Sequence, residues 1–424
     1  MGGVAGHLSH LTDNLDFTFG EIKSILRDVA SAEIEAVEKV DGQNLFFSVD
    51  PPTGEIRTAR NKGDINKGGM TPEEYKQKWA NHFPSVRDAF MNGFEAISRA
   101  VQRMSPQELA EVFGETGNNY VNAEIMYTGN PNIINYNGDY IVVHNLHEFD
   151  DEGKNVGVTR RGAFQSLVSY IEDIEGELDA EQWGVSGPRT VELQNIIDQG
   201  PYEDLVAFLD SLGVADDATL ADFADEKLLA GAVGDLPIPV NEQQGLIDLI
   251  LGRDEAPTLA SLKKGKPKEI QTQISAMATK TNKKGTISKV LFPIELAISD
   301  FAVEVLRGMK SFFVDEHDSE VMRIKDDLEA AASAIESYSG DDAEKLGDLL
   351  DKQMAKLKTA ENVASSMEGI VFEYPPGSEE LYKLTGAFAM VNQIVGRARR
   401  LPAQEKIQDS VMRNYVKELI LSNF

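Results

Sequence analysis

A lysine stands directly before an Asp-Gly pair early in the chain, in the stretch Glu38-Lys39-Val40-Asp41-Gly42. A lysine amine attacks phosphorus only when it is unprotonated, and a free lysine, with a pKa of ~10.4, is almost wholly charged at neutral pH. Neighbouring cations would lower that pKa and would also stabilise phosphate groups. Because the chain contains no cysteine, any covalent chemistry needs another side chain. Taken alone, Lys-x-Asp-Gly is more simply explained by a hairpin with a type I′ Asp-Gly turn.

Four further motifs follow the lysine on segments with the pattern of strands or strand ends. They are Arg60-Asn61-Lys62-Gly63, Ala123-Glu124-Ile125, Glu368-Gly369-Ile370-Val371-Phe372 and Leu381-Tyr382-Lys383-Leu384. With the lysine motif as motif I, this set resembles motifs Ia, III, IV and V of the ATP-dependent polynucleotide ligases, within the covalent nucleotidyltransferase superfamily. The lysine motif is most similar to the RNA ligase 2 type, in which a glutamate precedes the lysine and an asparagine follows five residues later, as Glu38 and Asn44 do.

The resemblance implies that Lys39 becomes covalently linked to AMP, with ATP and Mg²⁺ as cofactors. Glu368 would hold the metal, and Glu124 would contact the ribose hydroxyls and the metal, because hard cations take oxygen ligands. Lys383 and Arg60 would stabilise the phosphates and the leaving pyrophosphate. The catalytic residues so implied are Lys39, Glu368 and Lys383.

The remaining nucleotide contacts are also implied by the resemblance. Glu38 would accept a hydrogen bond from the exocyclic amine of adenine, and Asn44 belongs to the same nucleotide-binding segment. His144 stands near the position where the family has an aromatic side chain that stacks on adenine. A partly buried strand histidine is the alternative interpretation of His144.

Motif V departs from its usual form, because Thr385 stands where a second lysine is expected. One phosphate-binding cation is therefore missing or supplied elsewhere. The candidates are Arg397, Arg399 and Arg400, although a solvated helix face explains that cluster more simply.

Alternating and helical hydrophobic spacings predict the elements that position these residues. Helices are expected over 17–30, 72–115, 166–174, 204–212, 294–314 and 320–339, and in a basic tail to residue 424. Residues 36–63 are predicted as an antiparallel meander, with further strands over 120–129, 139–149, 368–377 and 380–386. We therefore expect an α+β fold, with a nucleotidyltransferase core of antiparallel sheets from residues 1–150 and 361–424 and a mostly helical insertion over 151–360.

Charge is distributed unevenly along the 424 residues. A formal net charge of −29 is unusual for a protein that handles nucleic acid, since phosphate contacts favour a basic surface. Acidic residues crowd 172–255, whereas lysines stand at 263, 264, 266, 268, 280, 283, 284 and 289. This basic stretch favours a nucleic-acid partner, although residues 263–268 also have the composition of a flexible linker.

No apolar run approaches the ~20 residues that span a bilayer, and the first residues lack a signal-peptide pattern. The sequence thus predicts a cytoplasmic protein with no membrane association, and it indicates no protein partner. The leading hypothesis is an ATP-dependent ligase that joins a 5′-phosphate to a 3′-hydroxyl. RNA is the preferred substrate, because of Glu38 and Asn44 and because roughly 40 residues after motif V are too few for the OB-fold typical of DNA ligases in this superfamily. The alternatives are a DNA ligase with the helical insertion as its clamp, and a non-sealing module that binds nucleotide or nucleic acid.

Overall fold

The computed structural model describes residues 8–129, 136–150, 155–159, 161–175, 183–197, 200–307, 309, 311–312, 367–378 and 380–386. Within these ranges the chain is α+β, with twelve α-helices and antiparallel and mixed sheets, which confirms the predicted fold class at that level. The chain divides into two compact units. None of the helices in the described ranges is long and apolar enough to cross a membrane.

The first unit contains both sheets and comprises residues 1–8, 35–192 and 306–424. Its larger sheet has the strand order β3-β2-β4-β5-β6, with β7 paired to β5. All pairings are antiparallel except that of β7. The strands are β2 (Gln43–Asp50), β3 (Glu55–Ala59), β4 (Asn119–Met126), β5 (Tyr140–Phe149), β6 (Asn155–Thr159) and β7 (Gly184–Ser186).

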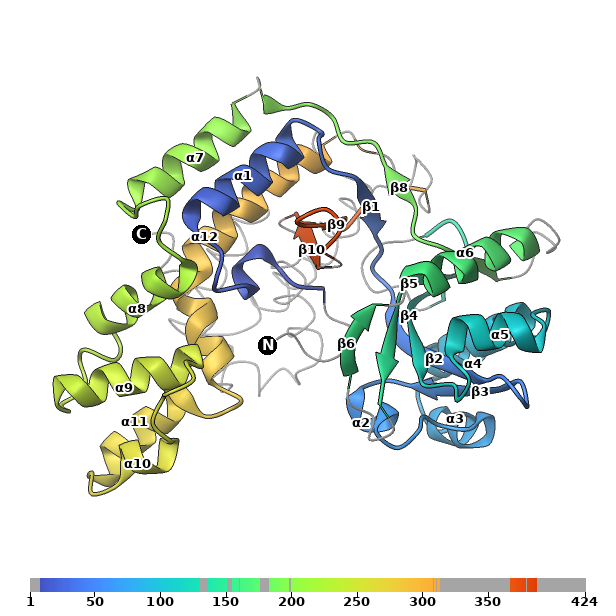
Figure 1. Ribbon diagram of the computed structural model, residues 1–424, viewed down its shortest axis with the longest axis horizontal. Coiled ribbons are helices and arrows are strands. Elements are labelled where there is room, and N and C mark those ends of the chain that lie inside the picture. The colour runs from blue at the N-terminus through green and yellow to red at the C-terminus, as the bar shows by residue number, and fades with distance from the viewer. Residues whose placement is uncertain are drawn as a thin grey trace, which may run out of the picture. The chain divides into compact units, whose positions relative to one another are not determined.

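Helices pack on one face of this sheet (Figure 1). They are α3 (Pro72–Trp79), α4 (Pro84–Val101), α5 (Pro106–Phe113) and α6 (Arg161–Glu175). The short α2 (Lys62–Ile65) instead packs through Ile65 against Phe46 and Ala59 on the opposite face. The helix predicted over 72–115 is three helices, because α3, α4 and α5 each begin at a proline. Thr71 and Ser105 also form capping boxes, which satisfy the free N–H groups of a first helical turn.

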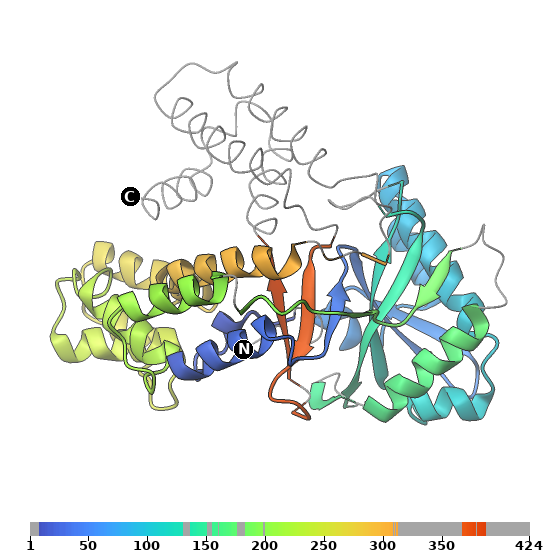
Figure 2. The same ribbon diagram turned by 90° about the horizontal axis from the view of Figure 1, so that it is seen from above.

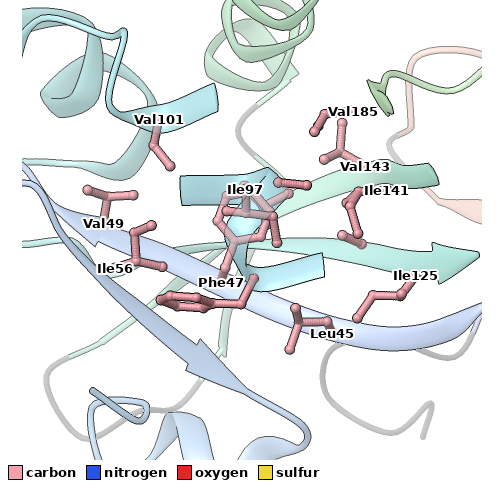
Figure 3. Close-up of a cluster of buried hydrophobic side chains, with 14 of the residues drawn as sticks. Leu45, Phe47, Val49, Ile56, Ile97, Val101, Ile125, Ile141, Val143 and Val185 are labelled. Atoms are coloured by element: carbon pink, nitrogen blue, oxygen red, sulfur yellow. The ribbon is translucent and has the colours of Figure 1, made fainter. Parts of the chain in front are cut away.

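Strand alternation decides which residues enter the core between the sheet and its helices. Leu45, Phe47 and Val49 of β2 all point toward α3–α6, together with Ile125 of β4 and Ile141 of β5 (Figure 3). The residues between them on each strand therefore point to the opposite face. That second face of the larger sheet carries the polar residues of the candidate site.

The smaller sheet joins segments that are far apart in the sequence. Its order is β10-β9-β1-β8, from β1 (Ala36–Lys39), β8 (Thr190–Val191), β9 (Gly369–Glu373) and β10 (Leu381–Thr385). Figure 2 shows β9 and β10 side by side next to β1. The strands predicted over 368–377 and 380–386 are thus present as an antiparallel pair.

The predicted meander over 36–63 is correct for β2 and β3 but wrong for β1. Asp50 pairs with Glu55 across a tight connection, as a hairpin requires. β1 instead pairs with β9 and β8 in the other sheet, and so the Asp41-Gly42 pair is not a hairpin turn. Local sequence cannot reveal this, because the partner of Lys39 is Gly369.

The second unit is helical and comprises residues 9–34 and 193–305. After a 3₁₀ turn (Leu11–Asp13), it contains α1 (Phe19–Ala30), α7 (Pro201–Ser211), α8 (Leu220–Ala230), α9 (Val240–Leu251), α10 (Leu259–Lys263), α11 (Lys268–Ala278) and α12 (Lys283–Leu306). Figure 1 shows α1 next to α7. A separate apolar cluster, including Leu246, Ile247 and Ile274, holds α8–α11 together.

These units differ from the boundaries expected from the sequence. Residues 9–34 group with the helical unit, whereas 155–191 supply β6, β7 and β8 to the sheets. Strands of two to five residues are too short to show an alternating pattern. The predicted helix over 320–339, the basic tail and Arg397, Arg399 and Arg400 lie outside the described residues.

Packing in the core of the first unit can be tested on α4. Ile97 is 1% exposed, and Ile97→Ala should lower the free energy of unfolding by about 2–5 kcal/mol. Phe83, which directly precedes α4 and is 81% exposed, is the control, and Phe83→Ala should change stability by less than about 0.5 kcal/mol. The chain has two tryptophans, Trp79 and Trp183, and both pack in or against this core. Urea unfolding followed by tryptophan fluorescence therefore reports this unit, and equal losses in both variants would contradict the packing.

Candidate active site

Lys39 is the last residue of β1, and its amine is buried against a glutamate from the far end of the sequence. Its Nζ lies 2.6 Å from Oε2 of Glu368, a residue 329 positions later, and donates a second hydrogen bond of 3.1 Å to the carbonyl of Val40. The two charged side chains are only 12% and 16% exposed. Because Gly369 pairs with Lys39, the start of β9 places Glu368 next to the lysine.

The charges around Lys39 determine its protonation. Burial opposes a charge on the amine, but the negative charges of Glu368, Glu124 and Asp41 outweigh this effect and raise the pKa of Lys39 above its ordinary value. Burial also disfavours the charged form of Glu368 and therefore raises its pKa above the ordinary value. The positive charge of Lys39 offsets this effect only in part. In this arrangement Lys39 is an ammonium ion, and its amine could act as a nucleophile only if the neighbouring carboxylates were neutralised.

Glu124 of β4 reaches the same lysine from the larger sheet. It points to the face opposite the helices, and its Oε2 accepts a 3.0 Å hydrogen bond from the N–H of Gly42. Burial would raise its pKa, but Lys39, His144 and the Gly42 N–H together lower it. Glu124 is therefore a carboxylate that stays ionised beside Lys39.

Residues 40–42, the crossover turn, carry the chain from β1 in the smaller sheet to β2 in the larger one. A Cβ at Gly42 would lie 2.9 Å from Glu124 Cβ and 2.9 Å from the Ile125 carbonyl oxygen. Only glycine allows the turn to approach β4 this closely. The glycine of the Lys-x-Asp-Gly motif is thus explained by packing against Glu124, and a hairpin turn is not needed to explain it.

His144 lies on β5 at a β-bulge, where the register with β4 shifts between Val143 and Asn145. Its Nε2 is 3.8 Å from Glu124 Oε2, which is too long for a hydrogen bond but close enough for an electrostatic interaction. Neither His144 Nε2 nor Asn145 Oδ1 has a hydrogen-bond partner among the described residues, although both atoms are buried. A buried polar atom of this kind can bind a polar ligand or an ordered water.

Asn44 lies on the same face as Glu124, because the two residues are direct partners across β2 and β4. Its Nδ2 donates a 2.5 Å hydrogen bond to Asn122 Oδ1. The predicted nucleotide residues Asn44, Glu124 and His144 are therefore brought together on one face of the larger sheet.

Lys383 is on β10, two strands from Lys39 in the smaller sheet. Thr385, Gly369 and Lys39 form one row across the sheet, and Lys383 and Val371 belong to the next row on the same face. Lys383 is therefore on the same side of this sheet as Lys39.

Glu38 precedes Lys39 on β1 and so points to the opposite face of the smaller sheet. There it is 2% exposed, and both carboxylate oxygens are occupied: Oε1 accepts from the Ser311 hydroxyl and Oε2 from the Phe312 N–H at 2.8 Å. Burial raises the pKa of Glu38, partly offset by these two donors. In this structure, the residue predicted to contact adenine binds the chain's own residues 311–312.

Arg60 is not brought to Lys39. Ala59, the last residue of β3, shares a face with Phe46, and the residue that follows it points toward α3 and α4. The Arg60 guanidinium lies 4.6 Å from the centre of the Phe90 ring and 5.9 Å from that of Trp79, and burial lowers its pKa. In this structure Arg60 interacts with aromatic rings of the helical layer, and the predicted phosphate contact is not supported.

Tyr136 is a residue of the site that no sequence motif indicated. Its hydroxyl oxygen accepts a 2.5 Å hydrogen bond from the N–H of Asp41 in the crossover turn. Burial, and then the charge of Asp41, raises the pKa of Tyr136 well above its ordinary value, so the phenol stays neutral. The only signal nearby was the Asn137-Gly138 turn pair, which predicts a turn and not a function.

The acidic part of this site can be compared with the needs of a divalent cation. In the described ranges, no group of three or more His, Asp or Glu residues is arranged to hold a metal. Mg²⁺ nevertheless commonly uses one or two carboxylates and completes its shell with water and substrate phosphates. Glu368, paired with Lys39, and Glu124, which acts on the same amine electrostatically, are two carboxylates of this kind.

Comparisons of the chain with protein-family models, curated proteins and solved structures found no match. The functional assignment therefore depends on the motif residues and on the geometry of this site.

The close approach at Gly42 gives a direct test of the site. Gly42→Ala should push the crossover turn away from β4, break the hydrogen bond to Glu124 and lower the stability of the first unit by about 1–3 kcal/mol. Gly162→Ala is the matched control, because a Cβ there meets nothing within 4 Å and the residue lies in α6. The control should be neutral or slightly stabilising. Urea unfolding with tryptophan fluorescence measures both variants, and indistinguishable midpoints would argue against the contact.

Proposed function

We propose that the protein is an ATP-dependent nucleotidyltransferase of the polynucleotide ligase type, in which Lys39 accepts AMP. The observation that carries the proposal is the environment of the lysine amine, which lies 2.6 Å from Glu368 and within the electrostatic influence of Glu124. An amine and two carboxylates from three distant segments thus meet in one buried site. Adenylylation requires this combination of groups.

In the first step the deprotonated Lys39 amine attacks the α-phosphorus of ATP. A P–N bond forms to Nζ, the bond from the α-phosphorus to the bridging oxygen breaks, and pyrophosphate leaves with that oxygen and its electron pair. Nζ gives up two protons in this step, one before the attack and one from the nitrogen of the new P–N bond, and they pass to water and to the departing pyrophosphate. Glu368 Oε2, hydrogen-bonded to Nζ, would hold the metal instead of a proton. Any charge that neutralises Glu368 also removes the main cause of the raised pKa of Lys39.

Other residues of the chain hold the nucleotide in this proposal. Glu368 and Glu124 would hold Mg²⁺, which when bound supplies positive charge to the phosphates and the leaving group. The unpartnered His144 Nε2 and Asn145 Oδ1 suit the ribose hydroxyls next to Glu124. Lys383, on the lysine side of the smaller sheet, contributes a cation for the phosphates.

Sealing would follow in two further steps. An oxygen of a polynucleotide 5′-phosphate attacks the phosphorus of lysyl-AMP and releases the Lys39 amine. The 3′-hydroxyl oxygen of the other strand then attacks the 5′-phosphorus, loses its proton and displaces AMP. We favour RNA as the substrate on the resemblance of Glu38 and Asn44 to the RNA ligase 2 type, with DNA nicks as the alternative.

A second candidate function is a binding module that holds a nucleotide or nucleic acid without forming a covalent bond. Two observations favour it: Arg60 faces the helical layer, and Glu38 is occupied by residues 311–312. Lys39 and Glu368 would then form a structural ion pair. The two candidates differ in whether the protein becomes labelled by ATP.

We expect the protein to form a covalent AMP adduct in the presence of Mg²⁺ and α-labelled ATP, visible on a denaturing gel. Lys39→Arg should abolish the adduct, because arginine stays protonated but preserves the ion pair with Glu368. This variant therefore separates loss of the nucleophile from loss of the fold. Adduct formation in Lys39→Arg, or AMP located by mass spectrometry on another residue, would refute the assignment, and an unlabelled parent protein would favour the binding module.

The lysines over 263–268 are candidates for binding the polynucleotide in the later steps. They do not lie in a long linker, because α10 ends at Lys263 and α11 begins at Lys268, and the two helices pack together. Lys266 is committed to an ion pair with Glu242. Lys264 and Lys268 are exposed and suit phosphate contacts.

The double substitution of Lys264 and Lys268 by glutamine should weaken binding of a labelled 5′-phosphorylated RNA strand. The slope of log affinity against log salt should flatten by about 0.7 for each lost contact, while self-adenylylation continues. The same double change at the exposed Lys67 and Lys76 of the first unit is the control for net charge. Titrations at several salt concentrations measure the slopes, and equal slopes in the two double variants would eliminate this binding surface.

A further inference from the structure

We propose that Tyr136 is a positioning residue for the Lys39 reaction, and that its hydroxyl fixes the backbone of the crossover turn that follows the nucleophile. The inference rests on the proposed adenylylation of Lys39. It adds to that proposal a residue that belongs to none of the motifs.

Tyr136 holds the turn in two ways. Its ring is 7% exposed and packs in a small cluster with Val40, Met126 and Val142. Its hydroxyl oxygen lies 2.5 Å from the backbone nitrogen of Asp41 and accepts that N–H. One side chain therefore anchors two successive residues of the crossover turn to β4 and β5.

The position of the turn matters because the reactive groups are attached to it. The Lys39 amine donates to the carbonyl of Val40, and the N–H of Gly42 donates to Glu124. A shift of the turn would move the lysine and the carboxylate relative to each other. Reacting atoms must be held to a fraction of an ångström for efficient attack, and a misplacement of about 1 Å can cost up to a hundredfold in rate.

The chemistry of the phenol suits this role. The Asp41 N–H needs an acceptor, but Asp41, Glu124 and Glu368 already crowd the region with negative charge. A hydroxyl accepts the hydrogen bond without adding a fourth charge next to the nucleotide phosphates. A phenylalanine would keep the packing and leave the N–H without this acceptor.

Tyr140 provides a matched control in the same cluster. It packs against the same apolar residues, but its hydroxyl bonds to Asn137 Oδ1 at 3.0 Å and not to the crossover turn. Tyr136→Phe and Tyr140→Phe each remove one phenolic oxygen and leave the ring in place. Both variants should fold with melting temperatures close to that of the parent.

The experiment combines single-turnover adenylylation with amide hydrogen exchange of peptides that contain Asp41. For Tyr136→Phe we expect the maximal rate constant of adenylylation (kcat for this single step) to fall about tenfold. The ATP concentration that gives half this rate (KM) should stay within about twofold, because the turn positions the nucleophile and does not bind ATP. Exchange at Asp41 should accelerate in this variant. Tyr140→Phe should match the parent protein in kcat, KM and exchange.

Three results would overturn the inference. One is a Tyr136→Phe variant with parental kcat, and another is an equal loss in Tyr140→Phe, which would indicate general packing. Unchanged exchange at Asp41 would show that the hydroxyl does not hold the turn. If the parent protein forms no adduct, the proposed function fails and the catalytic role of Tyr136 fails with it, whereas the exchange measurement still decides whether the hydroxyl holds Asp41.

Discussion

The buried ion pair between Lys39 and Glu368 is the interaction on which the first unit and its candidate chemistry both depend. Neither charge can be left alone in the interior, because removing one partner of a buried pair typically costs about 3–5 kcal/mol. The two residues come from opposite ends of the sequence, and so the pair can form only when β1 and β9 are adjacent. The strand pairing that builds the smaller sheet therefore also supplies the carboxylate that neutralises the lysine.

The same lysine links that sheet to the larger one. Glu124 belongs to β4 of the larger sheet yet interacts with Lys39 of β1. The crossover turn from β1 to β2, which joins the two sheets, has only the three residues 40–42. Such a short connection leaves the backbone little conformational freedom, so each contact of residues 40–42 limits the position of the turn. Gly42 has no room for a side chain, and Asp41 finds its acceptor on Tyr136. The position of Lys39 is thus set by the backbone that follows it.

Sequence patterns predicted the α+β class, most of the elements now described in the first unit and the residues that surround the lysine. Lys39, Glu124 and Glu368 could be predicted together because each follows from a short motif. Arg60 and Glu38 could not be placed in the same way, since the face of a strand residue depends on register, and register depends on partners far away in the sequence. Strand alternation alone already put Glu38 on the side opposite Lys39, whereas its adenine contact was expected from the resemblance and not from this alternation. Tyr136 and Ser311 had no signal, because each acts through a single hydrogen bond to a distant segment.

The charges of the site also bear on how an acidic protein could use ATP. Asp41, Glu124 and Glu368 surround one ammonium group, so the site carries more negative than positive charge before any nucleotide arrives. Triphosphate oxygens would be repelled there unless a cation accompanied them, because Coulomb interactions are strong where water is excluded. A divalent cation that bound the carboxylates would reverse this repulsion. It would also remove the charges that keep Lys39 protonated, so entry of the substrate and activation of the nucleophile would depend on the same neutralisation.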